Sequence, residues 1–236
     1  MRVLVTRPLD AAEETADALR AKGHEARLEP LLTIAIDKGP MLDVSAYERL
    51  VLTSANGARA AAARIQDRTI PVLAVGPATA DEARRAGFTE VQQADGNGIE
   101  GIVSCLSRMP RTSERPMLHV SGADIAGDLQ AEADRLGLKL ERKALYRAVP
   151  SATLSARTCD ELRIHGIDVV LFFSPRTAEI FASLVARAGL GQHLATITAC
   201  VISHNAAKAL KPLTFRKVLV AKDTTAGAML GLLDDM

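Results

Sequence analysis

The stretch Leu50-Val51-Leu52-Thr53-Ser54-Ala55-Asn56-Gly57 passes from a short apolar run through a hydroxyl-bearing turn into an Ala-rich segment. The apolar run predicts a buried strand, and the Ala-rich segment predicts a helix. The alternation continues with a strand at Val72–Val75 and a helix after Pro77. Strands that alternate with helices favour a parallel sheet, because parallel neighbours need a connection long enough to hold a helix.

This long unit returns near the C-terminus. Val169–Phe173 is an apolar run, Ser174-Pro175 is the turn, and further strands are expected at Ala199–Ile202 and Val218–Ala221. Repetition of the same succession predicts a repeated structural unit.

A shorter strand–helix unit also occurs twice. In the first copy, Arg2–Thr6 predicts the strand and Gly23 the end of the helix. In the second copy, Met117–Ser121 predicts the strand and Gly137 the end of the helix. The residues expected on one face of the second helix are Ala126, Leu129, Ala133 and Leu136. The units therefore follow one another as short, long, short, long.

This order predicts an α/β protein of two similar flavodoxin-like or Rossmann-like parallel-sheet domains. The strand pattern alone leaves the pairing of the units open, but Pro30–Ile34 and Ala144–Pro150 are extended and suited to a two-stranded linker. The expected division is a discontinuous domain 1 at 1–33 plus 151–236, a domain 2 at 37–143, and linkers at 34–36 and 144–150. Such a double linker is expected to act as a hinge.

The composition argues against several classes of function. The 236 residues are 48% hydrophobic but only 3% aromatic, and the net charge of +1 offers no broad field for a nucleic acid or an anionic membrane. No apolar stretch approaches the ~20 residues of a membrane span, and the apolar start is too short for a signal peptide. The three cysteines are far apart, so neither disulfides nor a zinc knuckle is expected. We expect a cytoplasmic protein, by default a monomer.

Four predicted turns place small or hydroxyl-bearing residues where a strand passes into a helix: Thr6-Arg7-Pro8, Thr53-Ser54-Ala55-Asn56, Ser174-Pro175-Arg176-Thr177 and Ser203-His204-Asn205. Free backbone N–H groups gather at such helix starts and stabilise anions, so a polycarboxylate ligand would suit this edge. The same residues also serve as ordinary helix caps, and both interpretations stay open.

Other chemistries have little support in the motifs. Gly76-Pro77-Ala78-Thr79 lacks the nucleotide-binding patterns, and the five histidines lack metal-ligand spacing. No nucleophile elbow or reactive-cysteine signature is present. His119, inside a predicted strand, is expected to be structural, whereas His204 opens a helix and keeps a possible functional role. Tyr146 lies in the expected linker, where a proton donor and a packing residue are equally open interpretations.

Taken together, Leu4–Pro8, Leu52–Gly57, Val75–Thr79, Ala144–Tyr146 and Phe172–Pro175 resemble the uroporphyrinogen-III synthase family, in order and over almost the whole chain. The resemblance implies a cofactor-free lyase of haem biosynthesis with its site in an interdomain cleft. It would cyclise hydroxymethylbilane, a linear tetrapyrrole, and invert ring D through a spiro intermediate. The resemblance further implies transient contact with the preceding pathway enzyme.

The resemblance also assigns site residues. Tyr146 matches the linker tyrosine proposed as proton donor in the family. The expected substrate-binding residues are Arg7, Ser54, Ala55, Asn56, Thr79, Ser121, Ser174, Arg176 and Ser203.

Two departures from the family pattern affect these assignments. Ser121-Gly122-Ala123-Asp124 lacks the arginine that relatives usually carry there, for which Arg176 is a candidate substitute, and Ser203–Ala206 replaces a common Gly-Pro turn. Without the resemblance, the same pattern would also fit a non-catalytic two-domain small-molecule binding module, or a scaffold without a catalytic cleft.

Overall fold

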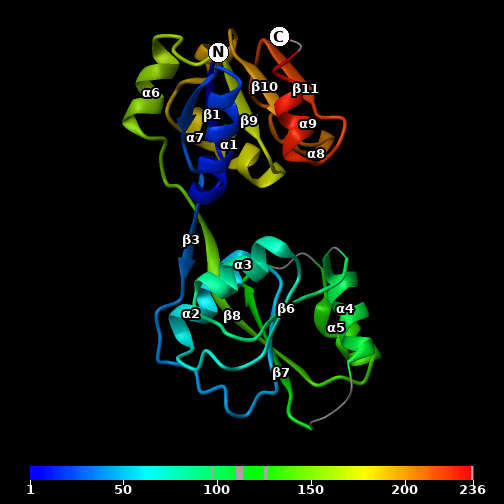
Figure 1. Ribbon diagram of the computed structural model, residues 1–236. Coiled ribbons are helices and arrows are strands. Elements are labelled where there is room, and N and C mark those ends of the chain that lie inside the picture. Colours follow the sequence, from blue (N-terminus) through cyan, green and yellow to red (C-terminus); the bar gives the residue numbers. More distant parts are fainter. Residues whose placement is uncertain (97, 110–113, 125–126, 235) are drawn as a thin grey trace. The chain divides into compact units, whose positions relative to one another are not determined.

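The computed structural model describes residues 1–96, 98–109, 114–124, 127–234 and 236 (Figure 1). The chain divides into two compact units, which we call unit 1 (Met1–Thr33 with Val149–Met236) and unit 2 (Ile34–Ala148). Both units are α/β. No helix within the described residues has the length and apolar character needed to span a bilayer.

Unit 1 is built on a parallel sheet in the order β11-β10-β9-β1-β2. Its strands are β1 (Arg2–Val5), β2 (Glu25–Leu28), β9 (Val169–Phe172), β10 (Thr198–Val201) and β11 (Lys217–Val220). Its helices are α1 (Leu9–Ala21), α6 (Ala156–Arg163), α7 (Pro175–Arg187), α8 (His204–Ala209) and α9 (Ala226–Gly231), with a 3-10 turn at Gly191–Leu194. Read from β2, the order is 2-1-3-4-5, the flavodoxin arrangement.

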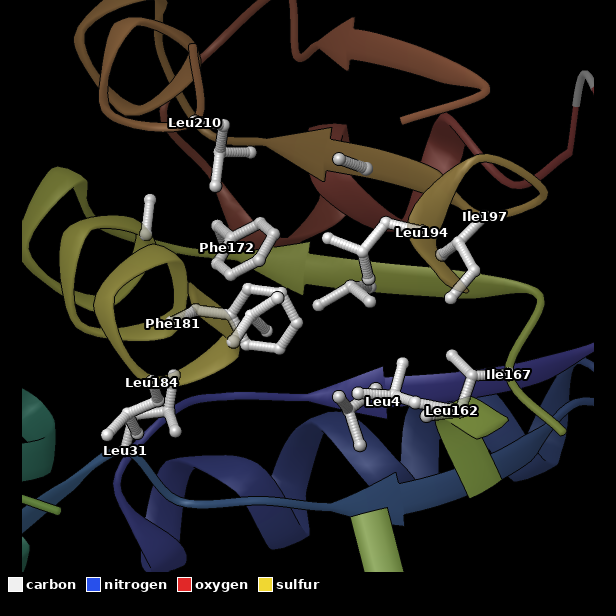
Figure 2. Close-up of a cluster of buried hydrophobic side chains, with 14 of the residues drawn as sticks. Leu4, Leu31, Leu162, Ile167, Phe172, Phe181, Leu184, Leu194, Ile197 and Leu210 are labelled. Atoms are coloured by element: carbon white, nitrogen blue, oxygen red, sulfur yellow. The ribbon is translucent and has the colours of Figure 1, made fainter. Parts of the chain in front are cut away.

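Helices cover both faces of this sheet, which is why its central strands are apolar throughout. Successive side chains of a strand point to opposite faces. Leu4 and Phe172 therefore pack with Phe181 of α7, as Figure 2 shows, while Val3 and Leu171 face α1 and α9. The rings of Phe172 and Phe181 meet edge-on with centroids 5.2 Å apart.

Unit 2 has a six-stranded sheet in the order β3-β8-β7-β4-β5-β6. Its strands are β3 (Leu32–Ile36), β4 (Leu50–Leu52), β5 (Val72–Ala74), β6 (Val91–Gln93), β7 (Met117–Gly122) and β8 (Leu140–Pro150). Its helices are α2 (Ala55–Arg64), α3 (Pro77–Arg85), α4 (Gly98–Arg108) and α5 (Leu129–Arg135). Helices α2 and α3 pack on one face with small side chains such as Ala58, Ala61 and Ala83, and α4 and α5 cover the other.

The predicted repeat is present in both sheets. Strands β8-β7-β4-β5-β6 of unit 2 follow the same spatial order as β2-β1-β9-β10-β11 of unit 1. The short sequence repeat supplies β1 in the sheet of unit 1 and β7 in the sheet of unit 2. The long sequence repeat supplies β9 in unit 1 and β4 in unit 2. Gly23 and Gly137 end the helices of the two short repeats, as expected. Their φ angles of 80° and 63° are the positive values that a glycine adopts at the end of a helix. Leu129 and Ala133 are buried on α5 as expected, whereas Ala126 lies outside the described residues.

The segments expected to connect the domains are strands. Residues 34–36 belong to β3 and residues 144–150 to β8, and these two strands are hydrogen-bonded neighbours in unit 2's sheet. The backbone N–H of Asp37 donates to the carbonyl of Leu145 at 2.8 Å. The points at which the chain passes between the units, 33/34 and 148/149, fall inside these strands.

Candidate functional site in unit 2 and the matching edge of unit 1

A cavity of about 380 Å³ opens in unit 2 where β4 and β7 end. These two neighbouring parallel strands mark the place where the strand order reverses, which is where open α/β sheets bind ligands. The cavity is lined by Thr53, Ser54, Val75, Gly98, Ile99, His119, Ser121, Gly122, Asp124, Gly127 and Tyr146. Three of the residues predicted from the sequence, Ser54, Ser121 and Tyr146, therefore share one cavity.

Tyr146 and Ser54 form the hydroxyl pair of this cavity, with their oxygens 2.8 Å apart. Ser54 is also the N-cap of α2, because its Oγ accepts from the backbone N–H of Gly57 at 3.0 Å. A serine hydroxyl has one hydrogen to give in addition. When Ser54 donates that hydrogen to Tyr146, the phenolic hydrogen of Tyr146 is left for a ligand.

Gly122 determines how closely the Tyr146 ring approaches β7. The register between β7 and β8 shifts between Ser121 and Gly122, and Gly122 lies opposite Tyr146. A Cβ on Gly122 would lie 2.9 Å from Cε2 and 3.0 Å from Cζ of Tyr146, so only glycine fits here without displacing the ring. The backbone N–H of Ala123 donates to the carbonyl of Tyr146 at 2.8 Å.

Arg142 is a residue that the sequence analysis missed. From β8 its Nε donates to Ser121 Oγ at 2.8 Å, and one terminal nitrogen, Nη2, donates to the carbonyls of Gly122 and Ala123 at 2.7 and 3.0 Å. Relatives usually carry an arginine in the sequence of this turn, and this chain does not. In the structure the neighbouring strand β8 supplies a guanidinium to the turn instead, from Arg142. The suggested substitute, Arg176, lies in unit 1.

His119 is buried, with 5% of its surface exposed, and hydrogen-bonds through Nε2 to Thr53 Oγ1 at 3.1 Å. Burial, with a further contribution from the charge of Arg142, lowers the pKa of His119 to about 4. The expectation of a partnered imidazole inside a strand is met, but this imidazole also lines the cavity. At neutral pH it presents an uncharged ring there.

The matching edge of unit 1 carries Arg7, which follows β1. Its guanidinium lies 4.4 Å from the ring centroid of Phe173, and one of its nitrogens donates to Thr15 Oγ1 at 3.0 Å. Burial lowers the pKa of Arg7, yet a guanidinium stays cationic at neutral pH. The hydroxyl of Thr6 donates to the carbonyl of Leu171 at 2.7 Å and so ties β1 to β9.

Helix starts border both edges, as predicted. Ser174 accepts from the N–H of Thr177 at 3.1 Å and caps α7, whose first turn contains Arg176. Ser203 caps the short helix α8 through the N–H of Ala206 at 3.3 Å.

Of the remaining predicted residues, two lie in the first turn of α2. Ala55 opens this helix, and Asn56 accepts from Arg59 at 3.0 Å. Thr79 is buried in α3, with 5% exposed, and does not line the cavity.

Metal binding and thiol chemistry would each need suitable side chains. In ranges 1–96, 98–109, 114–124, 127–234 and 236, no group of three or more His, Cys, Asp or Glu side chains could hold a metal ion. Burial raises the pKa of Cys200 to about 12, so this thiol stays protonated.

Comparisons with known proteins point to one family. A family model described as Uroporphyrinogen-III synthase HemD matches residues 13–231. The crystal structure of uroporphyrinogen-III synthetase from Helicobacter pylori 26695 aligns with 100% of this chain and 99% of its own, at 16% identity and a TM-score of 0.64. A uroporphyrinogen III synthase from Thermus thermophilus aligns with 100% and 98% at 16% identity and a TM-score of 0.44. A search of curated proteins finds no match.

Proposed function

The chain belongs to the uroporphyrinogen-III synthase HemD family, and from that premise we propose that it closes hydroxymethylbilane to uroporphyrinogen III with inversion of ring D. The proposal includes a spiro intermediate, a lyase reaction in haem biosynthesis and no cofactor. The observation that carries it is the Tyr146–Ser54 hydroxyl pair in the cavity at the reversal of strand order. The structural alignment with the Helicobacter pylori protein covers the whole of this chain.

In this proposal Tyr146 is the proton donor to the departing hydroxyl of the substrate. A tyrosine hydroxyl ordinarily carries its proton at neutral pH and can donate it to a leaving oxygen. Ser54 supports the transfer, because a hydrogen bond donated by Ser54 directs the phenolic hydrogen away from Ser54 and stabilises the phenolate as it forms.

The neutral state of His119 keeps one positive charge away from the cation that forms when the hydroxyl leaves. A protonated imidazole beside an azafulvene cation would oppose its formation by like-charge repulsion. His119 is held neutral by burial and by Arg142, so it adds no such charge at neutral pH. The electron-rich pyrroles belong to the substrate, and the protein's main task is to hold the two ends in position.

Carboxylates of the substrate are proposed to bind at the helix starts and at Arg7. The N-termini of α2, at Ser54 to Asn56, and of α7, at Ser174 and Arg176, present backbone N–H groups on the side where the strands end. Arg7 offers a cation whose hydration is already reduced by burial. Roles for Ser121, Ser203 and Thr79 in substrate binding remain predictions from the sequence, and Thr79's burial gives it the least support.

Three further predictions accompany the proposal. We expect a monomer in the cytoplasm, with at most transient contact to the enzyme that supplies the linear tetrapyrrole. Sedimentation of the purified chain alone, and then with that enzyme, tests the first and last of these.

The decisive experiment gives freshly prepared hydroxymethylbilane to chelator-treated protein and separates the oxidised products into type I and type III isomers. Type III above the spontaneous type I background is the expected result. Type I alone, accompanied by saturable binding of the tetrapyrrole, would instead favour the non-catalytic binding module.

A further inference from the structure

We infer that Arg142 is a positioning residue: its guanidinium locks the turn at Ser121–Ala123 and thereby holds the ring of Tyr146 beside Ser54. The inference rests on the proposed role of Tyr146 as proton donor. It adds a residue that does not itself line the cavity and acts through Ser121 and Gly122, which do.

The contacts of Arg142 are concentrated on one turn. Its guanidinium donates to oxygens of three successive residues, Ser121, Gly122 and Ala123, at distances between 2.7 and 3.0 Å. Hydrogen bonds from a charged donor are stronger than neutral ones. Because two of the three acceptors are backbone carbonyls, these bonds fix the path of the chain and not only one side chain.

This turn is where β7 loses its regular register with β8. A strand that shifts register needs other contacts to define its path. Arg142 provides them from β8, four residues before Tyr146, so the same strand carries the group that fixes the turn and the ring that rests on it.

Gly122 transmits the position of the turn to Tyr146. The place of its missing Cβ is only 2.9 Å from Tyr146 Cε2, and the next residue, Ala123, donates its N–H to the Tyr146 carbonyl at 2.8 Å. Movement of the turn therefore displaces both the ring and the backbone of Tyr146, and with them the 2.8 Å contact to Ser54.

Lysine cannot replace this arginine, because the geometry requires a planar fork. Nε and Nη2 donate at the same time to a side chain and to two carbonyls, whereas a lysine ammonium is a compact group on a flexible stem. Arg142→Lys therefore keeps the charge near His119 and removes the fork, which separates positioning from electrostatics.

The test uses the intrinsic fluorescence of Tyr146. The chain has no tryptophan and only two tyrosines, so in a Tyr47→Phe background Tyr146 is the sole emitter in this region of the spectrum. Arg142→Lys and the control Arg135→Lys are compared in this background. Arg135 is an exposed arginine of α5 in the same unit, paired with Glu132. Acrylamide quenching of the emission and steady-state turnover are measured for each.

We expect Arg142→Lys to increase quenching of Tyr146 and to lower kcat about tenfold with little change in KM, since small misplacements of catalytic groups cost rate. Arg135→Lys should change neither. Unchanged quenching in Arg142→Lys overturns the inference whatever the turnover. Increased quenching with unchanged kcat also overturns it, provided that Tyr146→Phe is slow. If Tyr146→Phe itself turns over normally, the proposed proton donor is wrong, and the quenching result alone decides whether Arg142 positions the ring.

Discussion

The two sheets share a strand order but present different chemistry where their strands end. In unit 2 this edge carries a cavity with paired hydroxyls and a neutral imidazole, at Tyr146, Ser54 and His119. In unit 1 it carries Arg7 stacked on Phe173, and the hydroxyl of Thr6 is used to tie strands together. We therefore propose a division of labour, in which unit 2 supplies the proton from Tyr146 and unit 1 supplies Arg7 as a cation for carboxylates.

The equivalent helix starts make this comparison experimentally useful. Ser54 follows β4 and caps α2, and Ser174 follows β9 and caps α7 in the same manner. Within unit 2 the hydroxyl of Tyr146 lies 2.8 Å from Ser54 Oγ, and unit 1 contains no tyrosine of its own. An effect on stability that both serine substitutions share reports on the helix caps, and an effect on kcat that is confined to Ser54→Ala reports on the hydroxyl pair with Tyr146.

The largest effect is expected for Tyr146→Phe. Loss of a positioned proton donor should lower kcat about 100-fold, while the retained ring preserves the contact with Gly122. The rate of type III product formation measures this, with Tyr47→Phe as the control because Tyr47 bonds Glu141 outside the cavity. Full activity in Tyr146→Phe would mean that unit 2 does not supply the proton through Tyr146.

His119 should make the stability of unit 2 depend on pH. Its pKa of about 4 lies below the ordinary 6.5, so between these values the unfolded chain binds a proton that the native state does not. Stability is therefore complete above pH 6.5 and decreases as the pH falls toward 4, with about 2 kcal/mol lost by pH 5.

Urea unfolding followed by tyrosine fluorescence measures this effect, because both tyrosines lie in unit 2. The control is His119→Gln, which should show a smaller loss of stability between pH 7.5 and pH 5. Equal losses in the two proteins would mean that His119 is not held neutral.

Arg7→Lys should act on substrate binding and not on the chemical step. Loss of the planar fork stacked on Phe173 is expected to raise KM about tenfold, equivalent to about 1.4 kcal/mol, with kcat nearly unchanged. Arg20→Lys on α1 is the matched control, because Arg20 is exposed and paired with Asp17. A fall in kcat at constant KM would place Arg7 in the chemistry and contradict the division of labour.

The smallest effects are expected for Ser54→Ala and Ser174→Ala. Each removes one helix cap and should cost about 1 kcal/mol of stability. Only Ser54→Ala should also lower kcat, by a few-fold, because it removes the partner of the Tyr146 hydroxyl. Unchanged kcat in Ser54→Ala would show that the Ser54 hydroxyl does not act through Tyr146.

Much of the fold could be predicted because its causes are local. Apolar runs such as Val169–Phe172 form strands buried on both faces, and the glycines after α1 and α5 adopt the positive φ that ends a helix. The repetition of these local patterns also predicted two similar domains.

The candidate site could be predicted only in part. The helix caps Ser54, Ser174 and Ser203 could be predicted, because the residue between a strand and the helix that follows it is usually the N-cap. Their roles in substrate binding stay predictions. Thr79 was suggested by its motif, but burial in α3 keeps it from the cavity, and burial depends on packing that the motif does not contain.

The sequence by itself determined the succession of elements, the small apolar residues of the core and the side of each sheet on which hydroxyls and helix starts gather. Only the tertiary structure decided that Ser54 meets Tyr146 across 92 residues, and that Arg142 reaches the turn after β7. The physical reason is that strand pairing and a register shift set these contacts. A one-residue difference in register turns a side chain to the other face, and no local pattern records that choice.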